Sequence, residues 1–305
     1  MLLTRKKVVQ VKLEATKGTA ETTGFTDVLV FDPEIRPTAP FEPRRGSGNY
    51  LGNAVAGIVG ERTGTFTCSA ELRGNGTNKM DEGLAILLQG CGLKNSSETY
   101  APSSDVSDHK SITIHVYEDG VRKVLYGAMG NVTLESASAR RIICNFDFQG
   151  IWATPTDVAL PSFSPGTEPP PLLIGATFTI GGVARKVSRF TIDLGASVKL
   201  REDMTANSGI AHAEIVDYEP TFGCDLEADL VANYDINGIW LAGTEAALSI
   251  VVGSGAGKQI TISAPKLQYR EVPEGDRDGI LIYHVTGQLN NDSGDDALKI
   301  KVEVM

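Results

Sequence analysis

Short runs of alternating apolar and polar residues dominate the chain, and turn-forming residues separate them. The clearest runs are rich in Val, Ile, Thr and Phe and are bounded by Gly, Asp, Asn and Pro; they are 65–72, 111–117, 141–148, 190–194, 258–263 and 280–286. A period of two places successive side chains on opposite faces of a strand. The pattern therefore predicts a mainly β protein built from short strands.

Two segments follow a helical pattern instead. Residues 78–89 begin with Asn78 as the expected N-cap, carry acidic residues in the first turn and end before Gly90. Residues 235–242 form a shorter helical candidate. We expect one helix in each half of the chain.

A proline-rich segment divides the chain near its middle. Residues 155–171 include the sequence SFSPGTEPPP, and this density of proline is incompatible with regular structure. We therefore predict a first domain at 1–154, a linker at 155–171 and a second domain at 172–305.

The two halves resemble each other in sequence. The run TFTCSAE at 65–71 matches TFGCDLE at 221–227, with Cys68 and Cys224 lying 156 positions apart. The same offset places the loop 46–60 on 202–216. Each run is followed by a helix candidate, a hairpin and a closing strand. The order of elements predicts an internal duplication.

The matched strands have one apolar and one polar face. Phe66, Cys68 and Ala70 alternate with polar residues, as do Phe222 and Cys224 in the second copy. Such a sheet packs one face on a core and leaves the other in contact with water. The interpretation from the residues alone is an exposed polar sheet face.

Composition excludes several classes of protein. The 305 residues are 41% hydrophobic and 22% charged, as expected of a globular protein, and the net charge of −10 argues against a nucleic-acid clamp. No apolar stretch of about 18 residues could span a membrane, and no secretory signal is expected. The four cysteines lack close pairing, so we interpret them as reduced core residues of a protein made in the cytosol.

No catalytic, metal or cofactor motif emerges. The four histidines are far apart, and neither a CxxC pair nor a GxSxG elbow occurs. The run VVGSGAGKQ at 251–259 resembles a phosphate loop, but Val252 stands where that loop needs glycine and Gln259 where it needs Ser or Thr. We interpret it as a hairpin turn matching 117–123. A nucleotide hydrolase built around 253–258 is the least favoured alternative.

The segment 37–53 is long, rich in Pro and Arg, and lacks a repeated apolar pattern. Long loops in compact domains are usually functional or disordered. Since there is no catalytic group to position, we interpret it as a contact between protein subunits, with a merely flexible loop as the alternative.

Several motifs together resemble the major tail tube proteins of long, non-contractile phage tails. They are the opening LLTRKKVVQVKLEATKGTA, a loop ending in NYLGN, the strand GTFTCSAEL, the helix GLAILLQGCGL, the hairpin SITIHVYEDGVRKVLYGAMGNVTLE and the segment FDFQGIWATPTDVALP. Each motif is short, but together they cover essentially the whole chain.

The resemblance implies two tandem tail-tube-type β-sandwich domains, each with one flanking helix, that contribute strands to an intersubunit β-barrel. It implies a structural protein, not an enzyme, without cofactors. Three chains would form a pseudo-sixfold ring, and stacked rings would conduct double-stranded DNA non-specifically during ejection. Partners would be other copies, the tape measure protein and tail-end proteins. The protein would be assembled in the host cytoplasm and located in the virion.

The resemblance also assigns candidate residues. The polar strand faces would line the lumen through Thr67, Ser69, Glu71, Asp147, Asp225 and Glu227. A loop at 43–60 would reach the neighbouring ring through Arg44, Arg45, Tyr50 and Leu51, and its counterpart at 200–217 would do so through Arg201 and Met204. Arg73 does not fit a purely acidic wall.

A second class of function is a carbohydrate-binding or adhesin-like β-sandwich of a virion or cell surface. Such a module needs an exposed aromatic platform. Trp152 and Trp240 lie in different halves of the sequence, which disfavours this alternative.

Overall fold

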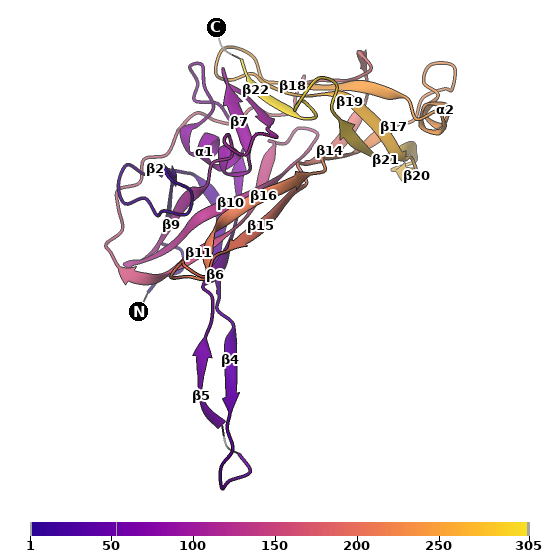
Figure 1. Cartoon of the computed structure of the whole chain (residues 1–305). Coiled ribbons are helices and arrows are strands. Elements are labelled where there is room, and N and C mark those ends of the chain that lie inside the picture. The colour runs from indigo at the N-terminus through magenta and orange to yellow at the C-terminus, as the bar shows by residue number, and fades with distance from the viewer. Residues whose placement is uncertain (1, 53, 304–305) are drawn as a thin grey trace.

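The chain folds into antiparallel strands with two short helices (Figure 1), in a computed structural model that describes residues 2–52 and 54–303. The elements of the first half are β1 (Lys7–Leu13), β2 (Thr26–Asp27), β3 (Val30–Thr38), β4 (Phe41–Arg45), β5 (Ala54–Val59), β6 (Thr63–Glu71), α1 (Glu82–Gly90), β7 (Leu93–Ser96), β8 (Thr99–Pro102), β9 (Ile112–Glu118), β10 (Val121–Ala137) and β11 (Ile143–Asp157).

The second half contains as many strands and the second helix. Its elements are β12 (Thr177–Ile180), β13 (Val183–Ala184), β14 (Val187–Asp193), β15 (Ala196–Glu202), β16 (Ile210–Tyr218), β17 (Thr221–Glu227), α2 (Ile236–Leu241), β18 (Glu245–Val252), β19 (Ile260–Glu271), β20 (Glu274–Arg277), β21 (Ile280–Asn290) and β22 (Lys299–Val302). The prediction of a mainly β protein is confirmed.

One scheme of strand pairing occurs twice. In the first half the order is β1, β9, β10, β11, β6 and β3, and in the second half it is β12, β18, β19, β21, β17 and β14. The registers agree as well, because Cys68 pairs with Phe146 and Cys224 pairs with Val285. The long strands β10 and β11 pair with each other along most of their length, with register shifts between Arg122 and Val124 and between Tyr126 and Met129.

The two halves share a sheet. Residues 133–137 of β10 pair with residues 189–193 of β14, so one sheet runs through β3, β6, β11, β10, β14, β17 and β21, with β19 and β20 sharing its last position. At another point β22 pairs with β8. One cluster of buried side chains contains residues of both halves. The division into domains therefore stays a prediction.

The proline-rich segment agrees in part with its predicted bounds. β11 continues to Asp157, beyond the expected boundary at 154, and residues 158–171 have no helix or strand. This segment contacts both halves, since Ser164 N–H donates to Asp27 and Glu168 pairs with Lys258.

The first helix begins later than the sequence predicts. Its N-cap is Asp81, whose carboxylate accepts from the Leu84 N–H at 3.2 Å, and not Asn78. Asn78 belongs to a turn in which the Asn75 side chain accepts backbone N–H groups. Asp81 is also held by an ion pair with Arg73, which the local pattern does not reveal. The second helix begins after Asp235, as predicted.

The segment predicted as an irregular loop is a β-hairpin. β4 and β5 pair with each other and project away from the sandwich (Figure 1). The equivalent hairpin of the second half, β15–β16, lies against β10 and β11 instead. There Ala213 and Ile215 pack against Met129 of the first half. The prediction of a long irregular segment was wrong because its strands are exposed and therefore lack an apolar stripe.

Glycines allow the β15–β16 hairpin to approach the first half closely. A Cβ on Gly18 would lie 2.0 Å from the carbonyl oxygen of Ala211, and Gly127 lies against His212. Gly18 also has a φ of 77°, which disfavours other residues.

We expect Gly18→Ala to destabilise the protein by about 1–3 kcal/mol more than Gly175→Ala, because overpacking adds to backbone strain. Gly175 is a matched control, since it has a φ of 66° and open space around its Cα. Urea unfolding of each variant measures the decrease in its free energy of unfolding. Equal losses in the two variants would contradict close packing of the hairpin on the first half.

Candidate functional site: the polar face of the shared sheet

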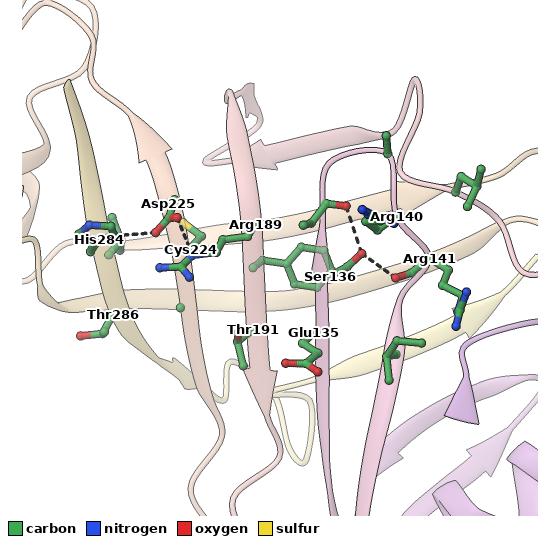
Figure 2. A pocket seen from close by; sticks show the side chains of 17 residues that line it. Glu135, Ser136, Arg140, Arg141, Arg189, Thr191, Cys224, Asp225, His284 and Thr286 are labelled. Carbon is green, nitrogen blue, oxygen red and sulfur yellow. Dashed lines mark hydrogen bonds and ion pairs between the residues drawn. The ribbon is translucent and has the colours of Figure 1, made fainter. Parts of the chain in front are cut away.

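The shared sheet presents one polar face that crosses the junction between the halves. In β10 and β14 the residues Thr133, Glu135, Thr191 and Asp193 are exposed or half-buried and alternate with buried ones. Figure 2 shows this region, where a hollow of about 940 Å³ is lined by residues of β10, β14, β17 and β21.

The register places all six predicted lumen residues on this face. In β6, Thr67, Ser69 and Glu71 alternate with buried apolar residues. Asp147 stands opposite Thr67 on β11. Asp225 and Glu227 alternate with Cys224 and Leu226 on β17 and continue the same row. That this face lines a lumen stays a prediction.

Most of the predicted acidic residues are paired with cations. Glu71 accepts from Arg141 at 2.8 Å, and Glu227 lies 3.2 Å from Lys186. Hydrogen bonds also join strands across the face. Ser69 Oγ donates to Asn145 Oδ1 at 2.7 Å, and Asn145 Nδ2 donates to Glu135 at 2.9 Å. The face is therefore polar with locally balanced charge, rather than uniformly acidic.

Asp225 is the most strongly bound of these carboxylates. Its oxygens contact Arg189 Nε at 2.5 Å and His284 Nδ1 at 2.6 Å (Figure 2). Burial alone would raise the pKa of Asp225, but the hydrogen bonds from His284 and Arg189 outweigh it and lower that pKa. Asp225 thus remains ionised and holds β14, β17 and β21 together.

Asp147 has the opposite environment. Among the described residues, no Lys, Arg or His lies within ion-pair distance of its carboxylate. Although Asp147 is exposed, the strands around its carboxylate partly desolvate it and raise its pKa. The ionised form of Asp147 is therefore less favourable here than in water.

Arg73 lies away from the polar face. It is buried, and its Nη2 contacts Asp81 at 3.1 Å at the start of α1. Arg73 therefore does not contribute a positive charge to the predicted acidic lining of the lumen.

The sequence did not reveal the ion pairs of the face. Arg141 follows the turn after β10, Arg189 lies on β14, and His284 lies on β21, so each meets its carboxylate across strands. The alternation of residues 280–286 places His284 on the polar face, but only the pairing register shows that it meets Asp225.

The predicted contact residues occupy the two hairpins. Arg44 and Arg45 end β4. Tyr50 and Leu51 lie in the tip between β4 and β5, where Tyr50 is 82% exposed and Leu51 is fully exposed. Arg201 lies on β15, and Met204 is fully exposed in the turn after it. Their roles in contacts between subunits stay predictions.

The other sequence features have structural roles. The glycine run at 253–257 joins β18 to β19, and Lys258 pairs with Glu168 at 2.6 Å. Trp152 packs against the core, whereas Trp240 lies on α2 and donates to the Arg270 carbonyl. Within residues 2–52 and 54–303, no group of His, Cys, Asp and Glu could hold a metal ion.

A comparison with protein families shows to which family the chain belongs. The family model of phage tail tube proteins matches residues 4–304. The chain belongs to the phage tail tube protein family. It is thus a structural subunit of the virion that self-assembles into a tube. No curated protein matches the chain. In the part of this tail tube protein that the structure describes, no helix is long and apolar enough to cross a membrane.

We expect Asp225→Asn to lower the free energy of unfolding by about 1–2 kcal/mol at pH 7, because it removes charge-assisted bonds to Arg189 and His284. The folded-state pKa of Asp225 is lowered, so its contribution is present above the unfolded pKa of about 3.9 and is lost as the pH falls through the lower folded value. Urea unfolding of the unassembled protein at pH 7 and pH 3 measures this.

Asp147→Asn is the matched control with the opposite sign. The folded pKa of Asp147 is raised, so its favourable term is present below about pH 3.9 and is lost as the pH rises through the folded value. We expect Asp147→Asn to be as stable as the wild type, or more stable, at pH 7. Equal destabilisation by both variants at pH 7 would refute the assignment of these two environments.

Proposed function

We propose that three copies of this protein form a ring whose sheets join edge to edge into one barrel. Four strand positions come from each half of the chain, which supports a pseudo-sixfold ring. A barrel of twenty-four strands spaced about 4.8 Å apart has a backbone diameter of about 37 Å before strand tilt widens it. Such a barrel is wide enough for a DNA duplex.

The polar face lines the channel in this proposal, and DNA passes along it during ejection. The opposite face of the sheet is unsuitable, because Phe66, Phe148 and Phe222 pack it into the core. Proteins bind DNA by neutralising phosphates with unpaired Lys and Arg. Here the pairing of Arg141 and Arg189 with carboxylates supports passage without binding. This neutralisation is the observation that carries the proposal.

The β4–β5 hairpin connects one ring to the next. An isolated hairpin has no core in which to bury apolar side chains, and those of β4–β5 are exposed to solvent. They are Phe41, Tyr50, Leu51, Val55, Ile58 and Val59. In a protein that assembles with itself, another copy supplies the missing cover. The tip of β15–β16 with Arg201 and Met204 is the second contact. The tape measure protein and the tail-end proteins contact the ends of the tube, and assembly takes place in the host cytoplasm.

Electron microscopy of the purified protein at increasing concentration tests this function. We expect stacked rings of one diameter, with three chains in each ring and an open channel. A species that stays monomeric at all concentrations and ionic strengths would contradict the proposal. Duplex DNA added to assembled tubes should show no retention at physiological salt.

We expect Leu51→Asp to raise the concentration needed for tube formation by about tenfold or more, because burying leucine contributes about 1.5–3 kcal/mol and a charge cannot replace it. Isolated rings should still form. Leu51→Met is the matched control and should assemble like the wild type. Sedimentation velocity separates monomers, rings and tubes. Unchanged stacking in Leu51→Asp would exclude the hairpin tip from the contact between rings.

A further inference from the structure

The shared sheet ends in an edge strand on each side. Among the described residues, β3 pairs only with β6, and β20 pairs only with β21. Edge strands carry unpaired N–H and C=O groups that can pair with another chain. In a self-assembling protein these two edges are the places at which the sheet can continue.

The junction inside the chain shows how two such edges meet. β10 closes the sheet of the first half, and β14 opens that of the second. In the repeated scheme β19 takes the place of β10, and β20 continues that position along β21 as the outer strand, so β20 closes the sheet of the second half as β10 closes the first. In the same way β3 opens the first half as β14 opens the second.

The ladders give the residue equivalences. Phe222 and Phe66 are equivalent, because each lies two residues before its cysteine, Cys224 or Cys68. Phe222 pairs with Ile192, and Phe66 pairs with Ile35. Ile35 is therefore the counterpart of Ile192.

The closing strands follow the same rule. Leu134 pairs with Cys144, which lies two residues before Phe146. Glu274 pairs with Tyr283, which lies two residues before Val285, the equivalent of Phe146. Glu274 is therefore the counterpart of Leu134. Inside the chain, Leu134 pairs with Ile192.

We propose that β20 of one copy pairs antiparallel with β3 of the next copy, with Glu274 opposite Ile35. Gly275 then stands opposite Glu34, Arg277 opposite Asp32 and Pro273 opposite Arg36. This inference rests on the proposed ring and adds its partner strands and their register.

The backbone groups of the two edges fit this register. In the internal junction Ser138 N–H donates to Ser188 O, and Leu194 N–H donates to Val132 O. The equivalent outward residues are Glu274 on β20 and Ile35 on β3. Pro37 is the counterpart of Leu194, and Pro33 and Pro37 have no N–H, so at these two positions β3 can only accept hydrogen bonds. The proposed ladder therefore has fewer hydrogen bonds than the β10–β14 junction, and the same loss weakens pairing of β3 with unrelated strands.

The side chains on the polar face are complementary. Arg277 Nη2 lies 3.5 Å from Glu227 within the chain, whereas its Nη1 has no hydrogen-bond partner among the described residues and would face the carboxylate of Asp32. Gly275 and Pro273 carry no long side chain, so Glu34 and Arg36 can lie across them. The internal junction has a similar polar bridge, in which Asn131 donates to Asp193 at 2.7 Å.

Disulfide formation in the double variant Arg36→Cys, Pro273→Cys tests the register. These residues form a non-hydrogen-bonded pair in the proposed ladder, and such pairs bring Cα atoms to about 4.5 Å, within disulfide range. After mild oxidation of assembled protein we expect a covalent ladder that ends at the closed ring. The four native cysteines are buried, and burial raises the pKa of their thiols, so they contribute little background.

Two controls make the result specific. Thr133→Cys, Asp193→Cys places the same pair in the internal junction and should give only an intrachain disulfide. Glu34→Cys, Pro273→Cys is displaced by two residues and should link at least tenfold more slowly. Faster linking in this variant than in Arg36→Cys, Pro273→Cys would overturn the register. Wild-type tubes without links in either variant would overturn the strand pairing, whereas failure of the wild type to assemble would contradict the proposed function itself.

Discussion

The ladder between β10 and β14 is the interaction on which the rest of this structure depends. It joins two copies of one pairing scheme into a single sheet and fixes the register between them through Leu134 and Ile192. A slip of one residue would turn every side chain of a strand to the other face. The continuity of the polar face therefore follows from the backbone, and the residues on that face are free to serve charge balance.

Charge balance across strands distinguishes this face from an acidic surface. A net charge of −10 suggests electrostatic repulsion of DNA, yet the carboxylates of Glu71 and Asp225 are held by cations of neighbouring strands. These pairs both stabilise the sheet and remove isolated charges from it. Repulsion over a distance is screened beyond about 8 Å at physiological salt, so in the proposed channel local neutrality would matter more than net charge.

Local patterns predicted the strands, the polar face and the helix positions, because alternation is a property of neighbouring residues. They failed where distant residues decide the outcome. Asn78 is a residue type that often caps helices, but Arg73 holds Asp81 by an ion pair, and Asp81 is the N-cap. The β4–β5 hairpin escaped prediction because neither of its faces is buried within the chain. The pairing of His284 with Asp225 escaped prediction because the two residues lie on different strands.

The two hairpins show how a repeated scheme can serve different ends. β15–β16 buries Ile215 against the first half, with Gly18 and Gly127 allowing the close approach. β4–β5 occupies the equivalent place in its own half but keeps Leu51 and Ile58 exposed. A chain in which β15–β16 also projected would expose Ala213 and Ile215 as well before assembly. Packing the body of β15–β16 inside the chain therefore covers Ala213 and Ile215, and among the described residues it leaves β4–β5 as the hairpin that projects from the sandwich.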